Sequence, residues 1–354
     1  MSSRLRLALL LPVALLIPFA HVAQADPLKF FNNWFITGDY TVAGTGLKST
    51  GGVGTINITG VPCTSGTGAS AVIVPCATRG AVPAYPIAAF LYWETVESTD
   101  TPAAVNGVFD GSPITGTVLG SDGSSACWVT APSQTLRVYR ADVLRFLPID
   151  PANHLRGANG LHPVKLGNGV SGNAGVLPSG TLGASLVVIY RVVVAGKPLI
   201  VPLQSVVIYD GLSTLSKSNR VMSQQVSGFY QAVGPAGPKA KMTHIVGNGQ
   251  PSFNTVLRFN HDNIGTHLFS GSAGPNWDNP TFNISLDKDD SSYTTSANAE
   301  NNATCNSWGA IVSSTPVVDT DSDGLLDVWE SGGLHRNTQS SPATFGNCRF
   351  RARR

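Results

Sequence analysis

Apolar residues in this chain occur in short runs that are rich in β-branched and aromatic side chains. The runs end at clusters of Gly, Pro, Asn, Asp and Ser, a combination typical of strands joined by turns. Patterns compatible with a helix are confined to Arg140–Leu147 and Leu325–Glu330. The pattern therefore predicts an all-β protein. The predicted strands include Pro86–Glu97, Gln134–Val143, Ala184–Val194, Gln204–Gly211, Asn254–Asn260 and Pro280–Leu286.

Several predicted strands lack the strict alternation expected of a sheet with one solvated face. In TLRVYRAD the side chains of Leu136, Val138 and Tyr139 do not alternate, which indicates burial on both faces and favours two packed sheets. The chain shows no fixed-period repeat and no clear linker before about residue 312. We therefore expect one β-sandwich or jelly-roll-like domain with long loops across residues 26–312.

The composition supports a folded β-rich chain. Hydrophobic residues make up 42% of the 354 residues and charged residues only 12%, which is enough apolar material for a large core. Gly and Pro together account for 61 residues (38 and 23). They occur without the period of collagen, so they are best explained as turn residues between strands.

The first 25 residues have the organisation of a secretory signal peptide. Two Arg precede an apolar run, Leu7–Ala20, and an A-Q-A motif ends at Ala25, where we expect cleavage. A retained signal anchor is disfavoured, because the apolar run is short and contains two Pro. The later apolar stretch Gly183–Gly211 is broken by charged residues and Pro, so no membrane span is expected after signal removal. The predicted location is secreted or cell surface.

Charge is unevenly distributed along the chain. Residues 26–330 hold 16 basic and 21 acidic residues, a net charge of about −5, whereas residues 331–354 hold five Arg and no acid. An acidic body makes a nucleic-acid partner improbable. The basic ending lacks apolar periodicity, and two explanations stay open: a disordered tail or out-of-frame sequence.

Cysteine usage agrees with export to an oxidising compartment. We expect Cys63 to pair with Cys76 across a loop of small residues, and Cys127 to pair with Cys305. The fifth cysteine, Cys348, lies in the basic tail. A zinc site is disfavoured because the spacings of zinc ligands are missing.

The strongest chemical signal is the acidic stretch DTDSDGLLDVWE, Asp319–Glu330. It matches the calcium-loop pattern at every ligand position, and Gly324 stands where the loop must reverse sharply. A hard cation needs several oxygen ligands, which alternate residues of a tight loop can turn inward. The predicted Ca²⁺ ligands are Asp319, Asp321, Asp323, Leu325 through its backbone carbonyl, Asp327 and Glu330.

Two alternatives concern the nature of this loop, which we assign to residues 313–330. A solvated acidic turn, with Asp323 serving a helix N-terminus, is disfavoured because all the ligand positions are filled. A paired-helix EF-hand is also disfavoured. The incoming segment Gly309–Val318 is β-branched and contains Pro316, so it lacks the first helix.

The segments AFLYWETVE, VNGVFDG, LRVYRADV, GASLVVIYR, VVIYDG, AGPNWDNPTFNISL, CNSWGAIV and DTDSDGLLDVWE together resemble a class of secreted bacterial proteins. In that class an N-terminal β-rich exodomain leads into a calcium loop of the thrombospondin type 3 kind. The resemblance covers Phe31–Glu330. It implies a β-rich architecture and a calcium site, but this chain has one loop where such loops usually occur in tandem.

Other candidate sites carry weaker signals. A second ion site at Asp287, Asp289 and Asp290 is disfavoured because the Gly turn is missing, and His261 with His267 fits ordinary loop histidines better than a metal pair. Trp277 and Asp278 suggest either a sugar-stacking surface or, as we favour, a core position.

Motifs of common hydrolases and phosphate-binding enzymes are missing from the sequence. Glu94 and Glu97 lie three residues apart on a predicted strand, so their side chains should point to opposite faces. Two functions follow from these patterns: a calcium-stabilised, non-enzymatic adhesive or structural protein, or a carbohydrate-binding or glycoside-active protein using Trp277, Asp278 and Glu94. An inert envelope or matrix component is a third.

Overall fold

The computed structural model describes residues 28–98, 101–123, 134–151, 154–167, 180–194, 200–300 and 304–331. Strands dominate these residues, and helix is limited to two 3₁₀ turns, Gly68–Ser70 (η1) and Leu144–Phe146 (η2), and the short helix α1, Asp327–Ser331. The all-β prediction is confirmed. The predicted helix Arg140–Leu147 is wrong for its first half, because that segment completes a strand and only η2 follows.

The strands form one ten-stranded sheet, two four-stranded sheets and a small three-stranded sheet. The ten-stranded sheet runs in the order β18 (Trp277–Asp278), β15 (Ala240–Gly247), β21 (Ser307–Pro316), β13 (Leu203–Thr214), β1 (Leu28–Gly46), β12 (Gly180–Arg191), β6 (Tyr85–Glu97), β10 (Thr135–Asp142) and β9 (Thr117–Asp122), with β19 (Thr281–Ile284) also on β15. One four-stranded sheet runs β2 (Val53–Ile58), β11 (Gly160–Leu166), β7 (Asn106–Phe109) and β8 (Ser112–Thr115). The other runs β14 (Val221–Ser227), β20 (Ser292–Ala299), β16 (Thr255–Phe259) and β17 (Asp262–Thr266). The small sheet runs β4 (Val72–Val74), β3 (Cys63–Ser65) and β5 (Val82–Pro83).

Strand β1 holds the ten-stranded sheet together at its middle. Its first half, to Thr37, pairs with β13, and its second half, from Gly38, pairs with β12. At the switch, a side chain on Gly38 would place its Cβ only 2.0 Å from the carbonyl oxygen of Tyr190. Only glycine fits so close an approach of two backbones.

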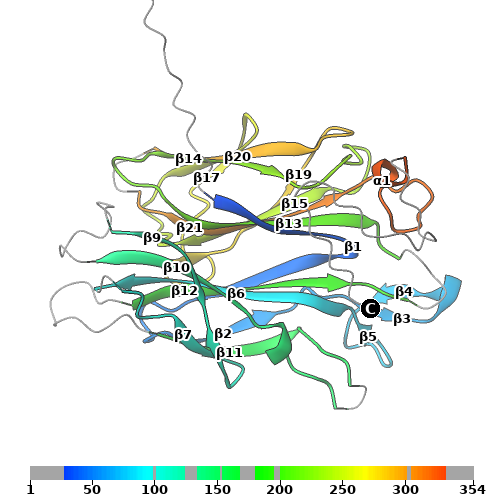
Figure 1. Cartoon of the computed structure of the whole chain (residues 1–354), viewed down its shortest axis with the longest axis horizontal. Helices are drawn as coiled ribbons and strands as arrows, with labels where there is room; N and C mark the ends of the chain where they lie inside the picture. Colours follow the sequence, from blue (N-terminus) through cyan, green and yellow to red (C-terminus); the bar gives the residue numbers. More distant parts are fainter. Residues whose placement is uncertain are drawn as a thin grey trace, which may run out of the picture.

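The sheets stack in layers separated by three apolar cores. The ten-stranded sheet folds back on itself, so that β9 contacts β13 and β21 contacts β6. Between its two halves lies a central core that includes Tyr40, Tyr92 and Ile208. The two four-stranded sheets cover the outer faces of these halves, on opposite sides of the molecule (Figure 1). Strands of the inner layers are therefore buried on both faces, which explains their weak alternation.

The two halves repeat one topology. In the N-terminal half, the inner sheet consists of β1, β12, β6 and β10, and the outer sheet of β2, β11, β7 and β8. In the C-terminal half, the inner sheet consists of β13, β21, β15 and β18, and the outer sheet of β14, β20, β16 and β17. Matching strands occur in the same order along the chain and pair with the same neighbours. This is the paired Greek-key arrangement of a jelly roll. The expected β-sandwich or jelly-roll-like fold is thus built from two jelly rolls that share β1, and its last strand, β21, ends at Pro316.

Matching tight turns close the β7–β8 and β16–β17 hairpins. Phe109 pairs with Ser112 around Asp110-Gly111, and Phe259 pairs with Asp262 around Asn260-His261. Asp110, Gly111 and Asn260 have positive φ, as such hairpin turns require.

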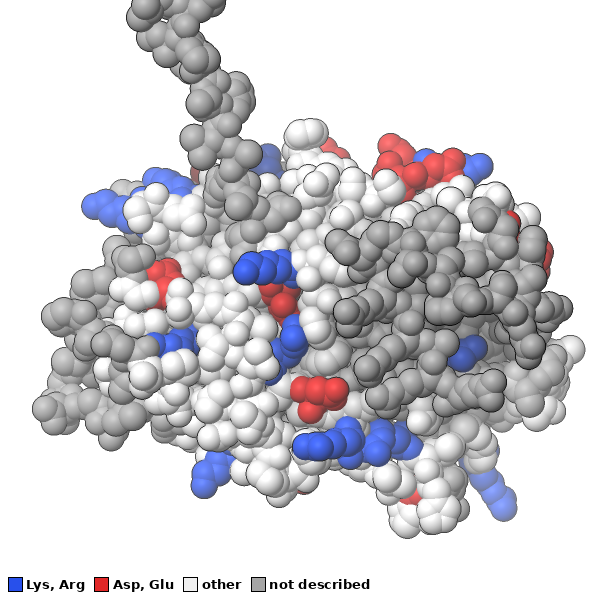
Figure 2. Space-filling model, in the orientation of Figure 1, with Lys and Arg blue, Asp and Glu red and all other residues white. Residues whose placement is uncertain are grey.

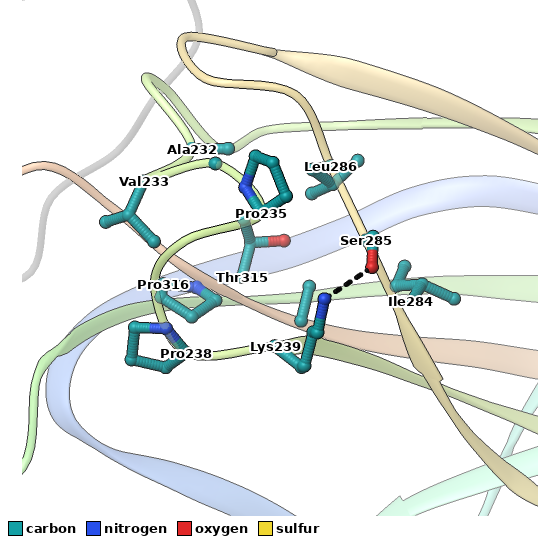
Figure 3. A pocket seen from close by; sticks show the side chains of 12 residues that line it. Ala232, Val233, Pro235, Pro238, Lys239, Ile284, Ser285, Leu286, Thr315 and Pro316 are labelled. Carbon is teal, nitrogen blue, oxygen red and sulfur yellow. Dashed lines mark hydrogen bonds between the residues drawn. The ribbon is translucent and has the colours of Figure 1, made fainter.

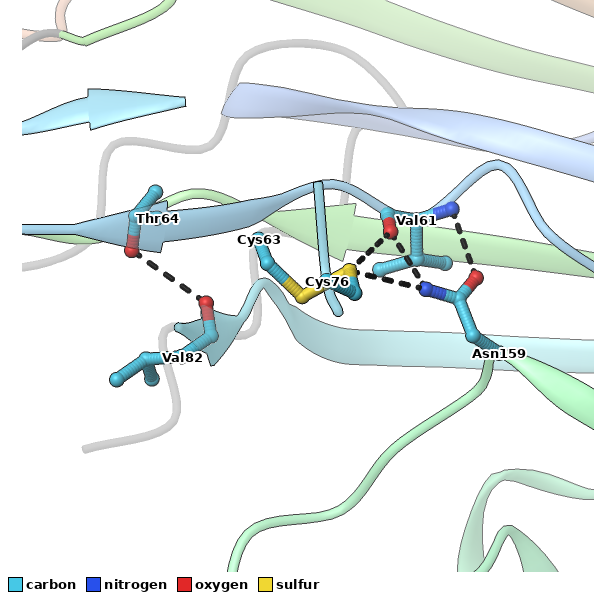
Figure 4. Close-up of a disulfide and its surroundings, with 6 residues drawn as sticks. All are labelled: Val61, Cys63, Thr64, Cys76, Val82 and Asn159. Carbon is cyan, nitrogen blue, oxygen red and sulfur yellow. Dashed lines mark hydrogen bonds between the residues drawn. A yellow bond between two sulfur atoms is a disulfide. The ribbon is translucent and has the colours of Figure 1, made fainter. Parts of the chain in front are cut away.

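The predicted disulfide between Cys63 and Cys76 is confirmed (Figure 4). It joins strand β3 to the segment after β4, and the Asn159 amide donates a hydrogen bond to the nearby Val61 carbonyl (2.7 Å). Cys305 is also disulfide-bonded, while Cys127, its predicted partner, lies outside the described residues. The signal segment 1–25, Cys348 and the tail beyond residue 331 lie outside them too. None of the described helices is long and apolar enough to span a membrane.

The packing of Gly183 against Trp277 gives a test of the junction between the two jelly rolls. A Cβ on Gly183 would lie 2.3 Å from two ring atoms of the fully buried Trp277. We expect Gly183→Ala to lower the free energy of unfolding by about 1–3 kcal/mol, as overpacking does. The matched control is Gly157→Ala, whose Cβ meets nothing within 4 Å. It should be neutral or stabilising by about 0.4–1 kcal/mol. Urea unfolding of both variants measures the difference, and equal stabilities would contradict this packing.

Candidate metal centre

The acidic loop leaves the end of β21 and is tied to the C-terminal jelly roll at both ends. On the incoming side Val317 forms a bridge with Ala232, and the Val318 amide donates to the Gln231 carbonyl (2.9 Å). The segment before the loop is a buried strand, so the prediction that no helix enters the loop is confirmed. On the outgoing side α1 begins at Asp327.

Three carboxylates converge within the loop. Asp319, Asp321 and Asp323 each offer an oxygen, and these oxygens lie within 4.8 Å of one another. Backbone groups hold them in place: Asp319 accepts from the amides of Asp323 (3.2 Å) and Gly324 (3.0 Å). Positive φ values at Ser322 (62°) and Gly324 (89°) turn the chain sharply enough to bring alternate side chains together. The predicted role of Gly324 as the turning residue is confirmed.

Leu326 anchors the loop to the protein interior. Its side chain is fully buried in the core of the C-terminal jelly roll, and Trp329 packs edge-on against Phe35 of β1, with ring centroids 4.7 Å apart. The sequence contained a signal for this anchor, since Leu325 and Leu326 form an apolar pair directly after the three converging acidic residues. The position of the carboxylates is therefore coupled to core packing.

The structure groups three of the six predicted ligands and places the others around them. Asp327 accepts hydrogen bonds from the Thr320 amide (2.7 Å) and hydroxyl (2.5 Å), so both its oxygens are engaged across the loop. The Glu330 carboxylate is not in the converging group, and the role of the Leu325 backbone carbonyl stays a prediction. The loop nevertheless affects the Glu330 carboxylate. Its pKa is raised by desolvation and then by the negative charges of Asp321, Asp323, Asp327 and Asp319.

Excess negative charge makes the loop receptive to a cation. Partial burial raises the pKa of Asp319, and the neighbouring Asp323 charge adds to that shift, while backbone amides oppose it. A bound cation would relieve this repulsion. The donor set consists of oxygens only, which suits a hard ion such as calcium or magnesium rather than a soft transition metal. The residues present therefore fit a divalent cation.

The weaker candidate sites are not assembled. Among the described residues Asp287, Asp289 and Asp290 form no group of converging ligands, and neither His261 nor His267 belongs to a converging group of three or more ligands. Trp277 and Asp278 are fully buried, so they offer no sugar-stacking surface, and the favoured core position is confirmed. The Trp277 ring donates to Ser185 (2.9 Å).

Glu94 and Glu97 point to opposite faces of β6, as predicted, and both are fully buried. Glu97 is paired with Arg137 (2.8 Å) and accepts from the Tyr139 hydroxyl (2.5 Å). Glu94 faces the other half of the sheet, where Ser307 donates to Oε2 (2.5 Å) and Oε1 meets no partner among the described residues. Burial raises the pKa of Glu94 to about 8. The two carboxyls therefore do not converge on a cleft as a glycosidase pair would.

A small pocket lies beside the C-terminal jelly roll, between the loop at Val233–Lys239 and the segment Ile284–Leu286 at the end of β19 (Figure 3). Its volume of about 10 Å³ accommodates roughly one water molecule. It is too small for an organic substrate.

Comparison with known proteins leaves the family open: no family model matches this sequence, and no curated protein matches it.

Because Glu94 is buried, we expect the free energy of unfolding to depend on pH. In the unfolded chain this carboxyl loses its proton near its ordinary pKa of 4.5, whereas in the folded protein it does so near 8. The free energy of unfolding should therefore fall as pH rises through this window, by at most about 1.4 kcal/mol per pH unit. Glu94→Gln removes this loss, so the variant gains stability over the wild type as pH rises.

Urea unfolding at several pH values across the window measures this effect. Glu97→Gln is the control. It leaves Arg137 buried without its carboxylate, so this variant should be destabilised at every pH in the window. A difference between Glu94→Gln and the wild type that stays constant with pH would contradict the assignment.

Proposed function

We propose that this protein is a secreted, calcium-stabilised, non-enzymatic extracellular or cell-surface protein with an adhesive or structural role. The observation that carries the proposal is the convergence of Asp319, Asp321 and Asp323 in a loop that Leu326 anchors in the core. The ion would thus act on stability rather than on a substrate.

The choice of calcium rests on the ligand pattern. Asp319, Asp321 and Asp323 would hold the ion, and the backbone carbonyl of Leu325, Asp327 and Glu330 would complete its oxygen shell. Asp327 would serve only if it exchanges its hydrogen bonds to Thr320 for the ion or a bridging water. Calcium accepts such irregular oxygen shells more readily than magnesium, which demands near-ideal geometry.

An extracellular location is supported by two observations. The disulfide between Cys63 and Cys76 is of a kind that persists in oxidising compartments. The N-terminal segment also has the organisation of a secretory signal.

The non-enzymatic character is supported by the interior position of the acidic residues on β6. Glu94 and Glu97 are buried in separate cores and held by structural partners. An adhesive or structural protein requires a rigid scaffold with exposed loops, which the two jelly rolls provide.

Calcium should stabilise the wild-type protein by mass action. At a free calcium concentration about 100 times the dissociation constant, the expected gain is about 2.7 kcal/mol in the free energy of unfolding. Asp321→Asn removes one converging carboxylate and should abolish most of this gain. Thermal unfolding with calcium and with a chelator measures it.

The matched control is Asp287→Asn, which removes an acidic group from an exposed loop outside the converging group. It should retain the full calcium response. An identical response of the wild type and Asp321→Asn would show that the loop is not the site.

A further inference from the structure

An open groove lies on the N-terminal jelly roll and its junction with β1. We call it the arginine groove. Its volume is about 740 Å³, within the range of ligand-binding sites. The residues that give it its chemistry are Phe31, Tyr85, Arg140, Asp142, Arg145 and Arg156.

A bulge in β1 places one wall of the groove. Pairing between β1 and β13 skips Phe31, passing from Phe30 directly to Asn32. Bulges of this kind re-aim a side chain and are frequent beside functional sites. Here the Phe31 ring packs edge-on against Phe90, with centroids 5.1 Å apart, and lies 3.4 Å from the guanidinium carbon of Arg140. The aromatic wall and the base of the groove are thus one packed unit.

Arg140 is held rigidly at the base of the groove. It forms an ion pair with the largely buried Asp210, which also accepts from the Tyr92 hydroxyl (3.0 Å). Its guanidinium is fixed between this carboxylate and the Phe31 ring. A donor held in this way loses little conformational entropy when it binds a ligand.

Two further arginines supply positive charge. Arg145 is exposed on η2, and its guanidinium lies 4.5 Å from the Phe146 ring centroid. Arg156 donates to the Leu147 carbonyl (2.7 Å). Neither forms an ion pair with an acidic side chain of the described residues. Figure 2 shows charged side chains scattered over a mostly uncharged surface, with several Lys and Arg gathered below its centre. The groove itself brings three arginines together, Arg140, Arg145 and Arg156.

The groove also contains an acceptor and an exposed ring. Asp142 is exposed, and one of its oxygens accepts from the Leu144 amide (3.0 Å), which leaves the carboxylate able to accept further hydrogen bonds. Tyr85 is 53% exposed at the edge. An exposed aromatic face of this kind is suited to an amphipathic ring.

We propose that the arginine groove binds an acidic oligosaccharide built from uronic acid residues. Such a chain meets each feature: its carboxylates accept from the planar forks of Arg145 and Arg156, its hydroxyls donate to Asp142, and its C–H faces pack on Tyr85. The open shape suits a chain rather than an enclosed small molecule. A nucleic acid fits less well, because the body of the protein is acidic overall. This site extends the proposed adhesive role to a class of partner, and it does not depend on calcium.

The test is isothermal titration of the full mature chain with a galacturonic acid hexamer, in chelator so that calcium cannot bridge carboxylates. Intrinsic tryptophan fluorescence confirms that the protein stays folded. We expect binding of this hexamer and no comparable binding of maltohexaose, a neutral chain. Arg145→Gln should weaken binding roughly 10-fold, the effect of losing a hydrogen bond to a charged group. Tyr85→Ala should also weaken it, and Arg145→Lys should restore only part of the Arg145→Gln loss.

The matched control is Lys217→Gln, which removes an exposed positive charge from the turn after β13 and should bind as the wild type does. The proposal is overturned if neither hexamer binds, if the neutral chain binds equally well, or if Lys217→Gln weakens binding as much as Arg145→Gln. Equal affinity for a sulfated hexasaccharide would also overturn it, because the groove would then recognise charge alone. Asp321→Asn should bind the hexamer normally. A failure of the calcium proposal can therefore be distinguished from a failure of the proposal for the groove.

Discussion

The double pairing of β1 is the constraint on which the rest of the structure depends. One strand completes an inner sheet of the N-terminal jelly roll with β12 and of the C-terminal jelly roll with β13. Because each inner sheet is apolar on both faces, neither jelly roll can expose its inner sheet to water without a large loss of hydrophobic stabilisation. We infer that the two jelly rolls unfold together, and that buried polar links between their inner sheets, such as Ser307 to Glu94, fix how they face each other.

Local chemistry in the sequence was sufficient to predict the class of fold. β-branched and aromatic runs identified the strands, and the irregular placement of Leu136, Val138 and Tyr139 correctly indicated burial on both faces. The duplication was not predictable in this way. The matched hairpins share only a Phe before a turn residue of positive φ, at Asp110 and Asn260. Apart from that, the two jelly rolls repeat only the order in which their strands pair. Pairing partners such as β1 and β12 are separated by more than a hundred residues, and no local pattern encodes them.

In the candidate site, too, some features could be predicted from the local sequence and others depend on the folded structure. The spacing of Asp319, Asp321 and Asp323 was enough to predict that they converge, because a tight loop with Gly324 brings alternate residues together. The hydrogen bonds of Asp327 to Thr320 were not foreseen, since they depend on where α1 begins. The arginine groove could not be seen at all: its residues come from separate strands and turns, and the bulge that turns Phe31 toward Arg140 exists only when β1 is paired.

The placement of β1 and β21 also has a mechanical meaning. Both strands lie beside β13 and are antiparallel to it, so they run parallel to each other. Leu28 pairs with Gly211 at one end of β13, while Pro316 pairs with Gln204 at the other. Tension applied between Leu28 and Pro316 would therefore shear both ladders lengthwise and load many hydrogen bonds at once, instead of peeling them apart singly. A protein attached through these two strands would resist pulling through the slow rate of unfolding rather than through its equilibrium stability.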